Sequence, residues 1–285
     1  MPPTLQPAGT AHRSTSGLDA ESYRFLREYI HRESGIMLDD DKHYLVEARL
    51  VPLVEQTHLG SLAALCRALQ QNDVLLRKKV VEAMTTHETL FFRDAAPFDG
   101  LRTTILPQLI EKHKNSRTLN IWSAAASSGQ EAYSLSMLLL EMHLTGWNVQ
   151  IFGTDLSEQI LARAREARYL QLEVNRGLPV QYLIKYFERD GLDWRIKEHV
   201  RKMVRFEQFD LRRPARGKGP FDIIFCRNVL IYFDIPTKKE ILANLRTALV
   251  PGGYLVLGSA ESTLSLDETF RRIAVGKAMF YQAPE

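Results

Sequence analysis

Residues 119–131 read LNIWSAAASSGQE, a short apolar run that leads into a turn of small residues. The run Leu119–Trp122 predicts a buried strand, and we expect a helix after the turn, near Gln130–Met142. A strand, a small-residue turn and a helix in this order are typical of a doubly wound α/β sheet, where ligands bind at the carboxyl ends of the strands. The loop at 123–131 is therefore the first place where we expect a ligand.

The alternation of strands and helices continues toward the C-terminus. Apolar runs at Val149–Asp155, Phe221–Cys226 and Tyr254–Gly258 predict further strands, with helices near Glu158–Arg168 and Thr237–Leu249. Short apolar runs separated by amphipathic helices are typical of a parallel sheet that is covered on both faces. The pattern predicts an α/β fold.

Two segments depart from this alternation. The segment 169–203 is too long for a connecting loop and contains the β-like run Trp194–Lys197, so it predicts a small antiparallel insertion. Two further β-like runs, Phe270–Val275 and Ala278–Tyr281, are separated by Gly276-Lys277. We expect them to form an antiparallel hairpin at the edge of the sheet.

The N-terminal part has a different pattern. Residues 1–17 are rich in Pro, Ser, Thr and Gly and predict a flexible tail. Residues 18–85 repeat apolar side chains at helical spacing, with breaks expected at Gly35, Pro52 and Gly60, and predict a helical domain. The remainder, 86–285, is predicted to be one α/β domain that carries the insertion at about 169–203.

Composition narrows the class of protein. The net charge is only +3, which argues against a nucleic-acid-binding surface, and no run of apolar residues is long enough to insert into a membrane. The two cysteines, Cys66 and Cys226, form no cluster, and His87-Glu88 lacks a second histidine at helical spacing, so neither a disulfide nor a metal site is predicted. These features favour a cytoplasmic protein.

Asp155 ends the second predicted strand, where a carboxylate can accept hydrogen bonds from both ribose hydroxyls of an adenosine-containing ligand. As an alternative, Asp155 or Ser157 would serve as the N-cap of the following helix. The loop at 123–131 lacks a Gly-x-Gly-x-x-Gly motif, and Asp155 follows Gly129 by 26 residues, which disfavours a dinucleotide. The small-residue turn would equally suit tight packing between the strand and the helix that it connects.

Two more segments combine aromatic and polar residues. In the segment 86–94, Arg93 is a candidate carboxylate clamp or a surface salt-bridge residue. In the segment 221–233, a buried strand leads into Arg227, Asn228 and Tyr232, which either face a ligand or pack against the fold.

As a set, these motifs resemble those of the CheR methyltransferases, over roughly residues 18–275. The matching motifs are Thr-x-x-Thr-x-Phe-Phe-Arg at 86–93, Ile-Trp-Ser-Ala-Ala-Ala-Ser-x-Gly-x-Glu at 121–131, Gly-Thr-Asp at 153–155, Phe-Cys-Arg-Asn-Val-Leu-Ile-Tyr-Phe at 225–233, Pro-Gly-Gly-Tyr-Leu at 251–255 and Gly-Ser-x-Glu-Ser at 258–262. There are departures: His87 replaces an asparagine usual in the first motif, and Gly129–Ala132 replaces the usual Gly-Glu-Glu-Pro.

The resemblance implies a class I S-adenosylmethionine-dependent methyltransferase with a Rossmann-like sheet, a C-terminal antiparallel hairpin, an N-terminal all-α domain and a small inserted β-subdomain. It implies transfer of a methyl group from S-adenosylmethionine to glutamate carboxylates on the cytoplasmic helices of methyl-accepting chemotaxis receptors. By matching positions, the cofactor-binding residues would be His87, Thr89, Arg93, Glu131, Asp155, Asp210, Leu211, Arg227 and Asn228. Arg93 and Tyr232 would serve catalysis, with Tyr232 beside the transferred methyl group.

The resemblance also concerns the receptor. Lys42 and Arg49 lie seven residues apart, on one face of a helix that looks like the receptor-facing helix of the family. Some members grip a pentapeptide at the receptor C-terminus through the β-subdomain, but the turn at 189–193 is short here, and we expect no dependence on that tether.

Other functions are compatible with the same fold, because fold does not determine the substrate. A methyltransferase for a small molecule or nucleic acid is one alternative, although no Asn/Asp-Pro-Pro-Tyr motif follows the strand at Phe221. A catalytically silent adaptor that binds receptors is another; His87 and Gln130 favour it, whereas retention of Arg93 and Tyr232 speaks against it.

Overall fold

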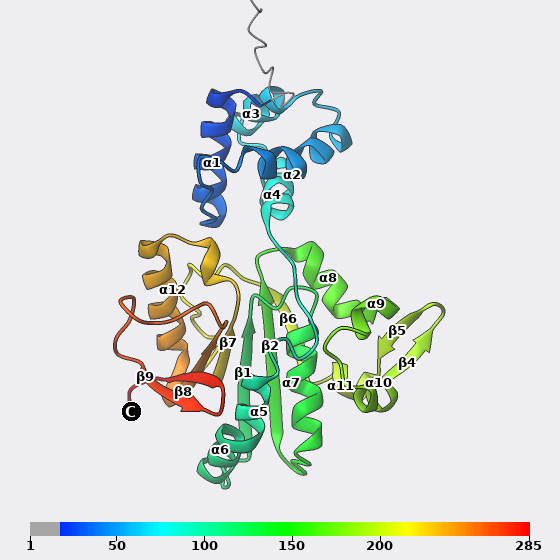
Figure 1. The fold of residues 1–285 in the computed structure, drawn as a ribbon, viewed down its shortest axis with the longest axis vertical. Coiled ribbons are helices and arrows are strands. Elements are labelled where there is room, and N and C mark those ends of the chain that lie inside the picture. The colour runs from blue at the N-terminus through cyan, green and yellow to red at the C-terminus, as the bar shows by residue number, and fades with distance from the viewer. Residues whose placement is uncertain (1–17) are drawn as a thin grey trace, which may run out of the picture. The chain divides into compact units, whose positions relative to one another are not determined.

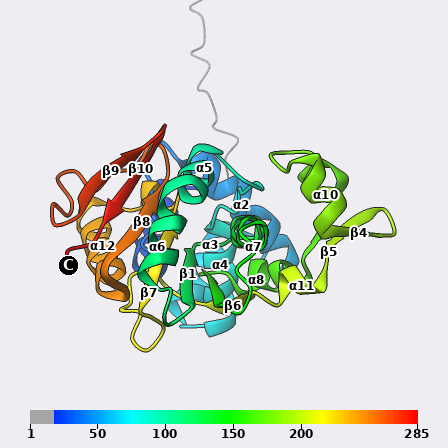
Figure 2. The same ribbon diagram turned by 90° about the horizontal axis from the view of Figure 1, so that it is seen from below.

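The computed structural model describes residues 18–285, so the tail predicted for residues 1–17 lies outside the described residues. The chain divides into two units (Figures 1 and 2). The described part of the first unit comprises residues 18–33 and Leu38–Met84. The second unit comprises Ser34–Met37 and Thr85–Glu285.

Helices build the described part of the first unit, as the helical spacing predicted. Side chains from all of them form its core, including Leu26, Leu50, Leu65 and Val80, each fully buried. At the start of α3, the Ser61 hydroxyl accepts the Ala64 N–H group and caps the helix. The helices are α1 (Ala20–Ser34), α2 (His43–Gln56), α3 (Leu62–Gln70) and α4 (Val74–Met84).

The helix break that we expected at Pro52 is absent, because α2 continues through this residue. Proline removes one N–H donor from a helix and so leaves the carbonyl of residue 48 without its usual partner. Ala48 and Pro52 are both exposed, so water can solvate this carbonyl group. The chain does leave the helical conformation at Gly35 and Gly60, as expected.

A mixed sheet forms the centre of the second unit, in the order β6-β2-β1-β7-β8-β10-β9. The five strands from β6 to β8 are parallel, and β10 runs antiparallel to both of its neighbours. The order reverses between β1 and β7, the kind of switch point at which doubly wound sheets bind ligands. The strands are β1 (Thr118–Ala124), β2 (Asn148–Asp155), β6 (Val204–Gln208), β7 (Phe221–Cys226), β8 (Leu249–Leu257), β9 (Arg271–Val275) and β10 (Ala278–Gln282).

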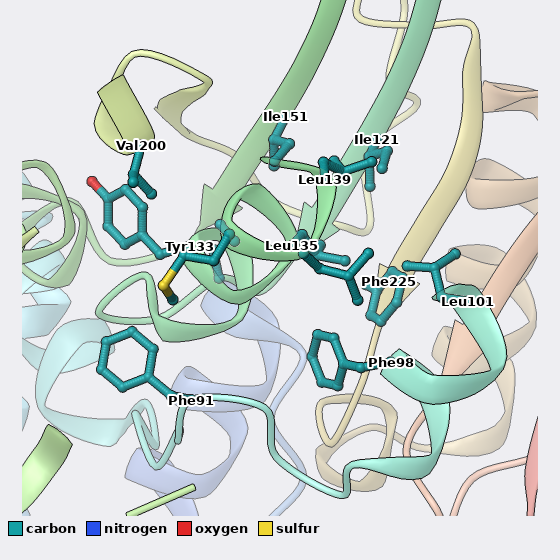
Figure 3. Packing of buried hydrophobic residues seen from close by; sticks show 14 of the residues in the cluster. Phe91, Phe98, Leu101, Ile121, Tyr133, Leu135, Leu139, Ile151, Val200 and Phe225 are labelled. Carbon is teal, nitrogen blue, oxygen red and sulfur yellow. The ribbon is translucent and has the colours of Figure 1, made fainter. Parts of the chain in front are cut away.

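Helices cover both faces of this sheet, which confirms the doubly wound α/β class. Successive strand residues point to opposite faces: Ile121 and Phe225 contribute to one core and Trp122 and Ile224 to the other. Figure 3 shows part of the first core, where Leu135 and Leu139 of α7 pack among the residues labelled there. The remaining helices outside the insertion are α5 (Ala96–Gly100), the π-helix η1 (Leu101–Ile105), α6 (Leu106–Lys112), α7 (Gln130–Glu141), α8 (Glu158–Glu166), the 3-10 helix η2 (Leu230–Tyr232) and α12 (Ile235–Ala248).

The predicted C-terminal hairpin is confirmed as β9 and β10, but two other details differ from the sequence analysis. Strand β6 was not predicted. Strand β8 begins at Leu249, earlier than the expected Tyr254, and its pairing with β7 is irregular between Leu249 and Tyr254. Residues Pro251–Gly253, which the sequence analysis placed before the strand, thus form an irregularity inside it.

The predicted insertion contains a small antiparallel sheet with the order β3-β5-β4. Two buried tyrosines attach it by hydrogen bonds to α7 and to the loop that precedes α7. The Tyr169 hydroxyl donates to the Ser128 carbonyl oxygen at 2.7 Å, and the Tyr186 hydroxyl donates to Glu141 at 2.5 Å. Its elements are β3 (Arg168–Tyr169), α9 (Gln171–Val174), α10 (Val180–Tyr186), β4 (Phe187–Asp190), β5 (Asp193–Ile196) and α11 (Glu198–Arg201).

Among residues 18–285, no helix is long and apolar enough to cross a membrane.

Candidate functional site

A cavity lies at the carboxyl ends of the parallel strands of the second unit and encloses about 940 Å³, part of it open to solvent. All the cofactor-binding and catalytic candidates from the sequence line it: His87, Thr89, Arg93, Glu131, Asp155, Asp210, Leu211, Arg227, Asn228 and Tyr232. Residues that the sequence did not single out complete the wall, among them Ser34, Ile36, Ser127, Phe209 and Val229.

Asp155 ends β2 as predicted, and its side chain is buried at the cavity. One carboxylate oxygen accepts the Ser127 N–H group at 2.9 Å and the other accepts the Ser157 N–H group at 3.0 Å. Burial raises the pKa of the Asp155 carboxyl above its ordinary value, against the lowering effect of these hydrogen bonds. The N-cap of α8 is Ser157, whose hydroxyl accepts the Ile160 N–H group, so Asp155 is not used as the helix cap.

The loop between β1 and α7 brings its backbone to the cavity wall. Ala125, Ser127 and Gly129 have φ values of 65°, 51° and 94°, in the left-handed region. Such values are costly for residues other than glycine and persist where the surroundings fix them. The Ser127 hydroxyl donates to the His87 carbonyl oxygen at 2.9 Å, which ties this loop to the segment that follows α4.

The segment 85–94 is held by its aromatic residues. Phe91 is fully buried and meets Tyr169 and Phe187 edge to face, with ring centroids 5.0 Å and 5.5 Å away. The next residue, Phe92, donates its N–H group to the Ser134 hydroxyl at 2.9 Å. The backbone that carries Arg93 is therefore fixed, and the Arg93 guanidinium donates to the Glu88 carbonyl oxygen at 3.0 Å.

Arg227 is the most buried charged group at the cavity, with a side chain only 2% exposed. Its guanidinium lies 3.1 Å from Glu131 and 2.9 Å from Asp94, and it also donates to the Arg93 carbonyl oxygen at 2.8 Å. Glu131 in turn accepts the Ser123 hydroxyl at 2.8 Å. The guanidinium thus joins the end of β7, the first turn of α7 and the segment that carries Arg93.

Glu261 holds the loop that follows β7. Its carboxylate accepts the N–H groups of Asn228 and Gly258, each at 2.8 Å, and that of Ile231 at 3.2 Å. Asn228 has a φ of 56°, and a Cβ added to Gly258 would lie 2.7 Å from a Glu261 oxygen and 2.8 Å from the Asn228 amide. Only glycine therefore allows the two loops to approach so closely. Tyr232, at the end of this loop, lines the cavity.

Sequence reasoning missed Asp94, Ser127, Glu261 and the segment Ser34–Met37. Glu261 belongs to the motif at 258–262, but a surface glutamate after a strand gave no sign that it would bind backbone N–H groups. Ser127 was part of the small-residue loop without a role of its own. Nothing in the pattern around Gly35 indicated a cavity wall.

The two receptor-recognition candidates lie in the helical unit. We expected Lys42 to lie in one helix with Arg49, but α2 begins at His43, and Lys42 directly precedes it in a non-helical conformation. The Lys42 ammonium group lies 3.8 Å from Asp41. Arg49, within α2, donates to the carbonyl oxygen of Met84 at the end of α4 at 2.5 Å. Arg49 therefore also connects two helices of its own unit.

The sheet order, the small-residue loop after β1 and the buried acid at the end of β2 define the class of nucleoside-binding, S-adenosylmethionine-dependent methyltransferases. The chain belongs to the CheR methyltransferase family. The family model described as "CheR methyltransferase, SAM binding domain" matches residues 87–279, and the model described as "CheR methyltransferase, all-alpha domain" matches residues 21–85.

Curated relatives agree over nearly the whole chain. The chain is 40% identical to "Chemotaxis protein methyltransferase Cher2" of Pseudomonas putida, over 95% of this chain and 99% of the relative. It is also 40% identical to "Chemotaxis protein methyltransferase 1" of Pseudomonas aeruginosa, over 92% of this chain and 97% of the relative. Among solved structures, magnesium protoporphyrin IX methyltransferase from Synechocystis, with bound SAM, is similar at 16% identity and a TM-score of 0.37, over 70% of this chain and 87% of that one.

The cofactor of this family is S-adenosylmethionine, and the residues of the cavity fit it. Asp155 accepts the N–H groups of Ser127 and Ser157 and a further backbone hydrogen bond from Leu156, and a carboxylate has about four acceptor positions, so it can still accept a ribose hydroxyl. Phe209, Leu211 and Val229 offer apolar contact for a purine ring. Within residues 18–285, no group of three or more His, Cys, Asp or Glu residues is arranged to hold a metal ion.

Proposed function

We propose that this protein transfers the methyl group of S-adenosylmethionine to glutamate side chains of methyl-accepting chemotaxis receptors, giving glutamyl methyl esters and S-adenosylhomocysteine. The single observation that carries the proposal is that Asp155, Arg93 and Tyr232 line one cavity. Asp155 offers a hydrogen-bond acceptor for a nucleoside, Arg93 offers a cation for a carboxylate, and Tyr232 offers a hydroxyl group. The family assignment and the names of the relatives, which are chemotaxis protein methyltransferases, support the same conclusion.

Within this proposal, Asp155 accepts the ribose hydroxyls, and Thr89, Asp210, Leu211 and His87 surround the nucleoside. Glu131, Arg227 and Asn228 line the same cavity. The ion pair between Arg227 and Glu131 makes these two residues a rigid base for the cofactor rather than mobile ligands.

The cofactor supplies a methyl carbon activated by a sulfonium sulfur, and the chain supplies position. A glutamate side chain has a reference pKa of about 4.3 and is ionised near neutral pH, so no residue of this protein has to remove a proton. Arg93 is proposed to hold a carboxylate, of the substrate or of the cofactor, and the Tyr232 hydroxyl to orient the acceptor. The apolar side chains of Phe209, Leu211 and Val229 make part of the cavity wall apolar, which favours a reaction in which opposite charges disappear.

The proposed partner is the cytoplasmic helical region of a receptor, which makes this a cytoplasmic enzyme without nucleic-acid partners or membrane insertion of its own. Lys42 and Arg49 are proposed to face the receptor. We expect Lys42→Glu to weaken receptor binding about tenfold and to leave cofactor binding unchanged, since tenfold corresponds to the loss of one good charge pair. Arg49→Ala is a less selective test, because Arg49 also bonds the Met84 carbonyl oxygen.

Dependence on a C-terminal receptor pentapeptide is not expected. Strands β4 and β5 are joined by only Gly191 and Leu192, which leaves a short turn at the tip of the insertion. Receptor fragments with and without their C-terminal residues should be methylated at similar rates.

The proposal is tested by incubating the protein with radiolabelled S-adenosylmethionine and receptor cytoplasmic fragments, with calorimetric binding of S-adenosylhomocysteine alongside. Methyl esters release methanol in base, whereas methyl groups on nitrogen do not. Base-labile label on the receptor is the expected result. Cofactor binding without label would indicate another substrate, and absence of cofactor binding would indicate a silent adaptor.

A further inference from the structure

The chain enters its α/β unit twice, and the two entering segments, called passages here, both contribute to the cofactor cavity. The first passage is Ser34–Met37, which belongs to the α/β unit although it lies between α1 and α2 in the sequence. Ser34 and Ile36 from this passage line the cavity. The second passage begins at Thr85, and residues 85–90 line the cavity as well.

The first passage is fixed to the loop that carries Tyr232. The Met37 N–H group donates to the Tyr232 carbonyl oxygen at 2.8 Å. Ser34 is 2% exposed, and its hydroxyl accepts the Ile36 N–H group at 3.2 Å. The backbone on both sides of Gly35 is therefore held in place by hydrogen bonds.

A side chain at Gly35 would be strained and crowded. Its φ is +76°, and an added Cβ would lie 3.0 Å from the Arg212 side chain and 3.1 Å from the Phe233 ring. Arg212 binds Asp210, its guanidinium 2.7 Å from the carboxylate, and Asp210 lines the cavity. The passage thus packs against residues that follow both β6 and β7.

From this geometry we propose that Ser34–Met37 is a positioning element of the cofactor site, which links cofactor binding to the state of the helical unit. The segment supplies no reactive side chain to the reaction. It acts by holding the backbone at Tyr232 and by closing the wall with Ile36. The role given to Tyr232 rests on the proposed function. The effect on cofactor binding does not, because it is independent of the methyl acceptor.

A consequence is reciprocal coupling between the two units. A partner on the helical unit that shifts Ser34–Met37 must change cofactor affinity, and the cofactor must change affinity for that partner by the same factor. Bound S-adenosylhomocysteine should accordingly slow amide hydrogen exchange at Met37. The loop around Gly60, in the helical unit, serves as the internal reference and should not respond.

The chain offers a matched pair of substitutions. Gly35→Ala and Gly60→Ala both place alanine at a positive φ, +76° and +78°, and so carry similar backbone strain. An added Cβ at Gly60 meets nothing within 4 Å, whereas at Gly35 it meets Arg212 and Phe233. Only Gly35→Ala should therefore weaken binding of S-adenosylhomocysteine, by about tenfold, within the range typical of coupled sites.

The experiment is calorimetric titration of S-adenosylhomocysteine into the full-length protein and both variants, at a temperature where each is folded by circular dichroism. Ile36→Ala, which removes lining atoms without adding bulk, is the second variant if Gly35→Ala does not fold. Unchanged affinity in the folded variants, an equal loss in Gly60→Ala, or no change in exchange at Met37 would overturn the proposal. Failure to methylate receptors would leave these results intact and would count against the proposed function alone.

Discussion

The Arg227 guanidinium and the Glu131 carboxylate, which both line the cavity, form an ion pair of 3.1 Å, with the Arg227 side chain only 2% exposed. Asp94 lies 2.9 Å from the same guanidinium, but its own side chain is 45% exposed. Of the two acids, Glu131 therefore depends more on Arg227 for compensation of its charge.

Removing Arg227 should be costly, because it leaves the largely buried Glu131 carboxylate without its cation. For Arg227→Met we expect the free energy of unfolding to fall by about 3–5 kcal/mol, the range measured when one partner of a buried ion pair is removed. Urea unfolding measures this change. Arg213→Met, at an exposed arginine that follows β6, is the control and should stay within about 0.5 kcal/mol. A loss below about 1 kcal/mol for Arg227→Met would contradict the assigned network.

Asp155→Asn should weaken binding of S-adenosylhomocysteine by about 10- to 100-fold, because charged acceptors contribute about 1.5–3 kcal/mol per hydrogen bond. Acidification should also weaken binding to the unmodified protein, because it protonates the carboxylate. Since burial raises the pKa of Asp155, this loss should begin at a higher pH than for an exposed aspartate, whose pKa is about 3.9. Calorimetry across the acid range measures both effects, and Asp155→Asn should lack this pH-dependent component.

The same pKa shift has a consequence for stability in the absence of cofactor. The folded-state pKa of Asp155 lies above its unfolded value, so ionisation of this group costs the folded state free energy. Its contribution to stability is most favourable below the unfolded pKa and declines as the pH rises through the folded pKa. Thermal unfolding of the ligand-free protein and of Asp155→Asn, compared over this window, should diverge with increasing pH. Parallel curves would show that the carboxylate is not perturbed.

Arg93→Ala and Tyr232→Phe test the proposed catalytic pair. Each should lower turnover at saturating cofactor by about 10- to 100-fold, the loss that misplacement of reacting groups by about 1 Å can produce. Initial rates of methyl transfer to receptor fragments are the measurement. Arg176→Ala, at an exposed arginine of the insertion, is the control. Near-normal turnover in both variants would refute the assignment.

Glu261→Ala should both destabilise the protein and reduce turnover, because it leaves the N–H groups of Asn228, Gly258 and Ile231 without their acceptor. The expected cost is about 1–3 kcal/mol for each group that water cannot reach, and less for those it can. Glu261→Gln keeps one acceptor oxygen and should recover part of the turnover. Glu166→Gln, at an exposed residue of α8, is the control and should change neither the free energy of unfolding nor the turnover. Equal turnover in Glu261→Ala and the unmodified protein would mean that the loop needs no such anchor.

Much of this architecture was predictable because the buried strands are short, nearly continuous apolar runs. Residues 221–226 are all buried, and their sequence contains only one charged residue. Strand β6 was missed because it is an edge strand in which exposed Arg205 and half-buried Glu207 alternate with apolar residues. Its pattern resembles a polar loop, and it directly follows the insertion.

The site was predictable where a motif combines a strand end with a polar residue, as at Asp155 and Arg227. The roles of Ser34–Met37 and Glu261 were not, because each depends on a contact with a residue distant in the sequence. The hydrogen bond from Met37 to Tyr232 joins two backbone atoms, which no side-chain pattern can indicate. Pro52 illustrates the converse, since a strong local signal for a helix break is overridden where the freed carbonyl is solvated.

The central claim is that this cavity methylates glutamate carboxylates, and mapping of the methyl group tests it most directly. Receptor fragments would be treated with the protein and S-adenosylmethionine, digested, and sequenced by tandem mass spectrometry, with Tyr232→Phe as the low-activity control. We predict methyl groups on glutamate side chains of the receptor helices. Methyl groups on lysine, arginine or cysteine, or unmodified receptors in the presence of a protein that binds the cofactor, would contradict the claim.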